Sequence, residues 1–208
     1  MITDKEIDIL ASQVGERLSA SRFSHTLGVM RAAELLCGYC LPEKRNELRA
    51  AALLHDIAKE LSVEEQQRII IDGGGTVSAE DVLSTPVLHS FAAPYVIMAD
   101  FNDFATEDIL RAVKFHTVGD AEMSIFDEIV FLADFIEDTR EYAACISLRN
   151  EILPALKEGN IKENQQLLHR AALKMTDFTI EYLNKRQRHI HSAMFAAKKM
   201  LEDKLMAN

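Results

Sequence analysis

The sequence of 208 residues predicts an all-α protein. Apolar residues recur at steps of three or four along most of the chain, and helix-start signals recur between these stretches. Only 4 prolines and 8 glycines interrupt the pattern, and apolar residues make up 48% of the chain. That content is enough for a sizeable core, so we expect one helical domain, or one domain with a helical extension.

The first predicted helices follow from capping signals and apolar spacing. Thr3-x-x-Glu6 resembles a capping box and begins a short helix. Apolar residues at helical spacing predict a second helix over about 20–39. A third helix begins after Pro42 and continues towards Lys59.

The later helices are marked in the same way. A helix over about 63–71 ends at Gly73-Gly74-Gly75, which we interpret as a turn, because a phosphate loop would need a following Lys-Ser/Thr. Thr85-Pro86 is a cap followed by proline at the first helical position, which places His89 in the first turn of a helix. Further helices are expected to begin at Ser78, Thr106 and Ser124, and helix is expected from about 161 to 205, as one or two segments.

No domain boundary is visible in the composition. Gly159 separates the last part of the chain, and we divide the sequence there into a core of residues 1–158 and C-terminal helices of residues 159–208. The C-terminal helices are expected to pack on the core or to form the interface of a homodimer.

Charge and hydropathy limit the possible partners and compartment. The formal net charge of −10 argues against a broad nucleic-acid surface, which needs a basic face. A small anionic substrate remains possible where cations gather, and metal ions would supply them most directly. No apolar run reaches the ~18 residues of a membrane helix, and the first ten residues lack a signal-peptide pattern. We therefore expect a cytoplasmic protein with no membrane partner.

Cys37-Gly38-Tyr39-Cys40 has the spacing of a redox or zinc motif. A redox motif would follow a strand in a βαβ unit, and none is predicted. A zinc site would need a second pair of ligands, and only Cys145 remains. We interpret the two cysteines as small buried side chains near a helix end.

Two polar positions interrupt strongly apolar stretches. Asp134 lies in the apolar run 129–136, where a buried carboxylate needs either a metal or an arginine partner, and the residues alone do not decide between them. His55-Asp56 lies in the run 50–58 of a predicted helix. Lys59 would share their helical face and could hold a phosphate beside a metal.

Histidines on other predicted helices strengthen a metal interpretation. His25, His89 and His116 would each be an ordinary core histidine if taken alone. Together with His55 they supply four imidazoles, which with two interior aspartates would satisfy two metal ions and leave positions for water and substrate.

The order His25, His55-Asp56, Asp134 on successive helices resembles the HD superfamily of metal phosphohydrolases. It is most similar to the YqeK-like branch, the symmetrical bis(5'-nucleosyl)-tetraphosphatases, over about residues 20–145. The segments that carry the resemblance are 24–29, 51–59, 88–89, 112–119 and 123–140.

The resemblance implies a helical HD bundle with a two-metal centre, often of iron, that cleaves dinucleoside tetraphosphates symmetrically into two nucleoside diphosphates. Imidazole and carboxylate ligands would equally suit manganese, cobalt, nickel or zinc. By motif, one metal would be held by His25, His55, Asp56 and Asp134, and the second by Asp56, His89 and His116, with Asp56 bridging. Phosphates would be faced by Lys59, Thr117, Arg140 and Arg22.

The residue types also suit the chemistry. A hydroxide that bridges two metals is a strong nucleophile near neutral pH, so we assign Asp56 and Lys59 to catalysis. The chain departs from the expected branch pattern after His89, with Ser90-Phe91-Ala92-Ala93 in place of a glycine-containing stretch. It also has Glu137-Asp138 where Glu-Pro is expected.

Three other interpretations stay open. The chain could hydrolyse another nucleotide, such as a cyclic dinucleotide, an alarmone or a deoxynucleoside triphosphate. It could be a nucleotide sensor without turnover, or a scaffold whose histidines fill a core. His189 and His191 lie two residues apart on a predicted helix and would point to different sides. The basic run 185–188 is interpreted as a solvated helix face rather than a nucleic-acid site.

Overall fold

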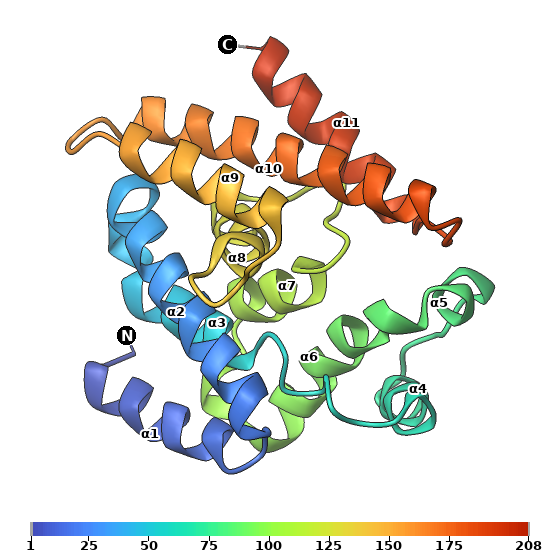
Figure 1. The fold of residues 1–208 in the computed structure, drawn as a ribbon. Helices are drawn as coiled ribbons and strands as arrows, with labels where there is room; N and C mark the ends of the chain where they lie inside the picture. Colours follow the sequence, from blue (N-terminus) through green and yellow to red (C-terminus); the bar gives the residue numbers. More distant parts are fainter. Residues whose placement is uncertain (1, 208) are drawn as a thin grey trace.

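A computed structural model describes residues 2–207, which form eleven α-helices joined by turns and short 3₁₀-helices (Figure 1). This range contains no strand, so the predicted all-α class is confirmed. The α-helices are α1 Asp4–Gly15, α2 Ala20–Cys40, α3 Arg45–Leu54, α4 Val63–Asp72, α5 Ala79–Leu83, α6 Leu88–Asp100, α7 Glu107–Phe115, α8 Ile125–Ile136, α9 Ala143–Ile152, α10 Ile161–Lys185 and α11 Ser192–Met206. The 3₁₀-helices are η1 Pro42–Lys44, η2 Thr85–Val87, η3 Asn102–Phe104 and η4 Leu153–Ala155.

The start signals predicted at Thr3, Ser78, Thr106 and Ser124 cap their helices as expected. The cap predicted at Thr85 was wrong, because Thr85 lies in η2 and α6 begins at Leu88 without a side-chain cap. Thr3 and Ser124 each accept a hydrogen bond from the backbone three residues later, and the carboxylates of Glu6 and Asp127 accept one from the backbone N–H of the cap residue. Such reciprocal bonds satisfy amide groups that a helix start leaves unpaired. Residues 62–65 and 78–81 form the same capping box.

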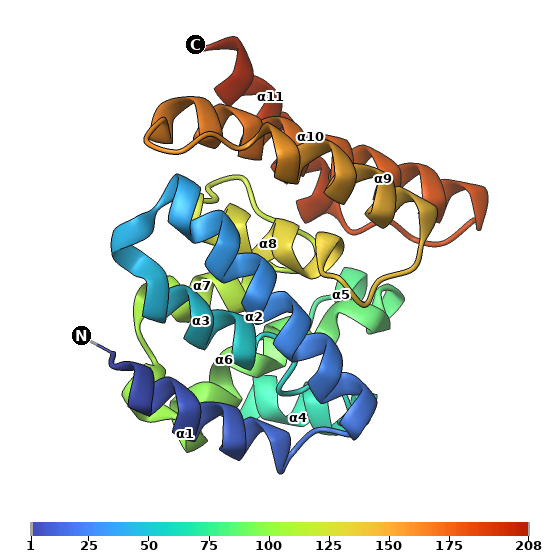
Figure 2. The same cartoon turned by 60° about the vertical axis from the view of Figure 1, so that its left-hand side comes forward.

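The centre of the molecule is a bundle of α2, α3, α7 and α8. Helix α2 packs against α3 and α8, and α7 packs against α3, α8 and α6. Helix α8 is apolar nearly all round and is buried along most of its length. Helices α1, α4 and α6 lie on one side of this bundle, and α9, α10 and α11 cover the opposite side (Figures 1 and 2).

The structure corrects the predicted end of the third helix. Helix α3 ends at Leu54, and residues 55–60 form turns instead of continuing the helix towards Lys59. The backbone there bonds three residues back, from Ile57 to Leu54 and from Lys59 to Asp56. His55 and Asp56 are therefore placed by tight turns, and the helical-face argument for Lys59 was wrong.

The C-terminal helical region consists of two helices with a linker at residues 186–191. Helix α10 ends in a Schellman motif: Arg188 N donates to Leu183 O, and Gln187 N donates to Asn184 O. Gln187 has a φ of +51°, the left-handed conformation that this motif needs. His189 and His191 belong to this non-helical segment, so their placement on a helix was wrong.

A buried ionic cluster joins the C-terminal helices to the bundle. Glu128 of α8 is fully buried and lies 2.6 Å from His169 Nδ1 of α10. Lys204 of α11 donates to the other carboxylate oxygen of Glu128 at 2.7 Å. The division of the chain at residue 158 stays a prediction.

The cysteine pair has the expected environment. Cys37 and Cys40 are free thiols buried in the last turn of α2, and burial raises their pKa values to about 11 and about 12. Across the described residues, no helix has the length and apolarity to cross a membrane.

Candidate metal centre

Three histidines of the site are oriented by the same local hydrogen bond to the main chain. The Nδ1 atoms of His55 and His116 each lie 2.6 Å from the carbonyl oxygen three residues earlier, and Nδ1 of His89 lies 2.9 Å from Pro86 O. A carbonyl oxygen only accepts, so Nδ1 of each ring carries the proton. The lone pair of each Nε2 is therefore directed away from the backbone, as metal binding requires.

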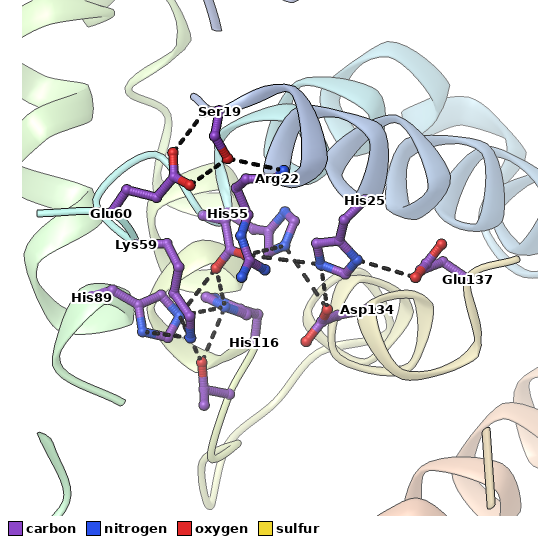
Figure 3. Close-up of polar contacts among 12 residues, drawn as sticks. Ser19, Arg22, His25, His55, Lys59, Glu60, His89, His116, Asp134 and Glu137 are labelled. Carbon is purple, nitrogen blue, oxygen red and sulfur yellow. Dashed lines mark hydrogen bonds and ion pairs between the residues drawn. The ribbon is translucent and has the colours of Figure 1, made fainter. Parts of the chain in front are cut away.

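Helix termini place these rings. His55 is the C-cap residue of α3, and His116 is the C-cap residue of α7. His89 lies in the first turn of α6, directly after η2, as predicted from Thr85-Pro86. The three termini converge, so that His89 Nε2 lies 3.2 Å from His116 Nε2 (Figure 3).

The fourth imidazole comes from the second turn of α2 and is held by carboxylates. His25 Nε2 lies 3.0 Å from Asp134 Oδ1, and His25 Nδ1 lies 3.1 Å from Glu137 Oε1 (Figure 3). Glu137 is buried, and its two oxygens also accept from the backbone N and the hydroxyl of Thr139 at 2.7 Å. Glu137 is a functional candidate that the sequence did not identify.

Asp56 lies between two groups of histidines. Its Oδ1 is 3.2 Å from His89 Nε2 and 3.6 Å from His116 Nε2. Its Oδ2 is 3.4 Å from His55 Nε2 and 3.8 Å from His25 Nε2. The two oxygens thus face different pairs of imidazole rings, a placement that would suit a carboxylate shared by two metal sites.

The donor set fits metal binding on grounds independent of any relative. Donor atoms of His25, His55 and Asp134 lie within 4.8 Å of one another, and so do those of His55, Asp56 and His116. The buried Nε2 atoms of His25 and His55 have no hydrogen bond of normal geometry among residues 2–207. Buried imidazole nitrogens without such bonds, next to carboxylates, are suited to divalent transition metals.

Buried charges shift the pKa values of the carboxylates. Burial would raise the pKa of Asp56, but His55 and the hydrogen bonds of His116 and His89 hold it well below its usual value. Burial likewise opposes ionisation of Asp134, and Arg140 and His25 hold its pKa well below the usual range. Both aspartates are therefore anionic at neutral pH, as metal ligands must be.

The pKa values of the surrounding bases also depend on burial. Burial lowers the pKa of His89 to about 4, against the opposing effect of Asp56. The pKa of Lys59 is also lowered by burial. Burial would lower the pKa of His55 too, but the charges of Asp56 and Asp134 and the hydrogen bonds to Asp56 and Ala52 together outweigh burial and raise that pKa.

The residues predicted to face phosphates surround the same site. Arg22 donates to Asp56 Oδ2 at 2.9 Å, and Arg140 donates to the backbone oxygen of Asp134 at 2.6 Å. Lys59 Nζ lies 3.3 Å from His89 Nε2. The distances from Thr117 Oγ1 are 3.0 Å to His116 Nε2 and 3.4 Å to His89 Nε2. The structure therefore brings together every residue of the predicted site.

The site opens into a cleft of about 730 Å³, a volume typical of pockets that bind small ligands. One side of the cleft is lined by Asp56, His89, His116 and Asp134, together with residues 84–87. The other side is formed by the end of α10, the linker and the start of α11, which the sequence did not connect with the site. Its lining residues are Thr179, Tyr182, Leu183, Arg188, His189, His191 and Met194.

Comparisons with known proteins agree with this geometry. The chain is 33% identical over 141 residues to a Halalkalibacterium halodurans protein named bis(5'-nucleosyl)-tetraphosphatase, symmetrical. The alignment covers 66% of this chain and 72% of that protein. A Bacillus subtilis protein of the same name is 31% identical, with 65% of this chain and 72% of that protein covered.

A solved structure extends the likeness to nearly the whole chain. The Clostridium acetobutylicum protein, described as a predicted HD superfamily hydrolase involved in NAD metabolism, superposes with a TM-score of 0.82 and 28% identity. The match covers 95% of this chain and 97% of that protein. The HD domain family matches residues 22–138, which include the six predicted metal ligands His25, His55, Asp56, His89, His116 and Asp134. The chain therefore belongs to the HD domain family.

Proposed function

We propose that the protein hydrolyses diadenosine tetraphosphate symmetrically, giving two molecules of ADP. The observation that carries this proposal is the bridging position of Asp56, whose oxygens lie 3.2 Å from His89 and 3.4 Å from His55. The names of the relatives support the choice of substrate. Family membership already implies a divalent metal and hydrolase chemistry.

The proposed ligands divide into two sets that share Asp56. His25, His55 and Asp134 would complete one set, and His89 and His116 the other. When bound, the metals would activate water and neutralise charge on the attacked phosphate. We infer that the metals are iron, since imidazole and carboxylate ligands suit it, although manganese, cobalt, nickel and zinc fit the same donors.

The remaining side chains would bind and orient the polyphosphate. Water adds to one of the two central phosphorus atoms, and the bond from that phosphorus to the central bridging oxygen breaks. The oxygen leaves on the second ADP, and one proton is released to solvent. Arg22, Lys59, Arg140 and Thr117 would hold the phosphate oxygens, and a phosphate beside Lys59 favours its protonated form.

The experiment that tests this function is hydrolysis of diadenosine tetraphosphate by protein of measured metal content, with chromatographic separation of the products. ADP as the sole product is expected. AMP with ATP would retain the hydrolase and reject the position of cleavage. Absence of turnover with iron, manganese and cobalt would reject the substrate and favour another nucleotide or a sensor.

Asp56→Ala tests the bridging ligand directly. Removal of a carboxylate shared by both sets is expected to abolish binding of at least one metal and to lower kcat at least about a thousandfold. Metal analysis of the purified variant, together with the hydrolysis assay, measures both effects. A variant with full metal content and full rate would contradict the assignment.

Two further expectations accompany the proposal. We infer a cytoplasmic location, because nucleotide substrates are found there, and a homodimer formed through residues 159–208. Sedimentation of the full chain would test the second inference.

A further inference from the structure

The basic run of residues 185–188 ends at the cleft wall that lies opposite the predicted metal ligands. Of that run, Arg188 lines the cleft, whereas Lys185 pairs with Glu181 on the exposed surface of α10. The interpretation of the whole run as a solvated helix face was therefore incomplete. One guanidinium of the run belongs to the same cavity as Asp56 and His89.

Arg188 differs from the other cations of the cleft in having no partner. Arg22 and Arg140 are paired with Asp56 and Asp134, and Lys59 contacts His89. The side chain of Arg188 forms no hydrogen bond or ion pair with any residue between 2 and 207. Arg188 is exposed at the edge of the cleft, so its guanidinium is open to an anionic ligand, in a chain whose net charge is −10.

The backbone that carries Arg188 is fixed on both sides. The Schellman motif holds it to α10 through the 188–183 hydrogen bond. After it, Glu80 of α5 accepts from the backbone and hydroxyl of Ser192 at 2.7 and 2.6 Å and lies 3.2 Å from His189 Nε2. His191 Nε2 lies 3.0 Å from Asp81. The guanidinium therefore extends from an anchored segment, so little main-chain conformational freedom is lost when it binds a ligand.

We propose that Arg188 binds the phosphates of the substrate half that lies beyond the scissile bond. This inference rests on the proposed function, in which the metals hold the central phosphates and each end carries a nucleoside. A polyphosphate centred at the metals must extend one half along the cleft, and Arg188 is the cation on its far wall. Tyr182 and Leu183 of the same wall offer apolar surface to the nucleoside of that half.

Arg188→Ala tests the assignment, because the side chain has no structural contact to lose. Calorimetric titration of the metal-loaded protein would compare ADP with the analogue of diadenosine tetraphosphate whose central bridging oxygen is a methylene group. We expect the variant to bind the analogue about tenfold to a hundredfold more weakly and ADP about equally well, since only the analogue reaches both ends. Lys185→Ala is the matched control from the same basic run and should change neither affinity.

The outcomes separate this inference from the proposed function. An unchanged affinity of Arg188→Ala for the analogue, or equal losses for the analogue and ADP, would overturn the role of Arg188. Failure of the wild-type protein to cleave diadenosine tetraphosphate would reject the proposed substrate instead. Inorganic tripolyphosphate would then decide: weaker binding by Arg188→Ala would support a polyphosphate site, and equal binding would reject it.

Discussion

The four histidines of the site differ in the hydrogen-bond partners that orient their rings. His55, His89 and His116 are held by main-chain carbonyls within their own turns. His25 is held by the Glu137 carboxylate, which is 112 residues away in sequence. A carboxylate partner makes an imidazole a stronger ligand than a carbonyl does, because its negative charge favours positive charge on the ring. Glu137 is therefore a positioning residue for His25.

Glu137→Gln removes this charge and keeps the shape. We expect the affinity for metal to fall about tenfold to a hundredfold, because the amide oxygen still accepts from His25 but no longer supplies the negative charge that strengthens an imidazole ligand. Metal titration of the apoprotein measures the change without any assay of activity. The exposed neighbour variant Asp138→Asn serves as control, and equal affinities for Glu137→Gln and wild type would contradict the role.

The six predicted metal ligands could be identified from the sequence, whereas Glu137 could not. His55, Asp56 and Asp134 interrupt apolar runs, which marks them as buried polar groups in need of partners. Glu137 follows such a run and looks like an ordinary end of a helix. The available signal was Gly28, a glycine in mid-helix three residues after His25, but its meaning depends on a contact between distant helices.

At the scale of elements, α2 and the end of α8 approach closely because Gly28 has no side chain. A Cβ at this position would lie 2.2 Å from Glu137 Oε2. Gly28→Ala would favour the isolated helix by about 1 kcal/mol. We nevertheless expect lower stability and weaker metal binding, because Glu137 is buried and bonded and cannot move aside.

Gly38→Ala in the same helix is a matched control for Gly28→Ala. A Cβ at Gly38 meets nothing within 4 Å, so we expect only the stabilising helical preference. Urea unfolding and metal titration of both variants measure the contrast. Equal behaviour of the two alanine variants would show that the α2–α8 approach is not restrictive.

The end of α10 carries a conformational cost at Gln187. A non-glycine residue with a φ of +51° is strained by roughly 1 kcal/mol. Gln187→Gly is expected to raise the free energy of unfolding by about 0.5–1 kcal/mol, because glycine is the usual residue at this position of a Schellman motif. Chemical denaturation measures this; a lower stability of the glycine variant would argue against the left-handed linker.

Helix starts were predicted more reliably than helix ends. Ser124 and Thr3 indicate the starts of their helices because their side chains cap backbone N–H groups of the first turn. The end of α3 has no such signal, since the run 50–58 is rich in alanine and leucine and contains no glycine or proline. Tertiary packing of His55 and Asp56 overrides that helical preference. The linker at 186–191 was not predicted because the left-handed position at the end of α10 is occupied by Gln187. A glycine there would have indicated the end of the helix.

At the scale of the whole molecule, Glu128 joins three helices through His169 and Lys204. Glu128→Ala leaves both basic partners without their buried anion, and we expect the free energy of unfolding to fall by about 3 kcal/mol. Thermal and chemical denaturation measure the loss. Glu151→Ala, which removes an exposed ion pair with Lys174, should cost less than about 1 kcal/mol. Similar losses for the two variants would contradict a special role for the buried cluster.

The two sides of the cleft come from separate stretches of the chain. All six predicted metal ligands lie within the family match at 22–138, whereas the opposite wall comes from residues 179–194. Substitutions in the α10–α11 hairpin can therefore reshape ligand preference without disturbing the reaction centre. Exchange of this hairpin between relatives would give chimaeras whose reaction is set by the protein that supplies residues 22–138. Their ligand preference would be set by the protein that supplies the hairpin. Evolution could diversify such proteins by the same separation.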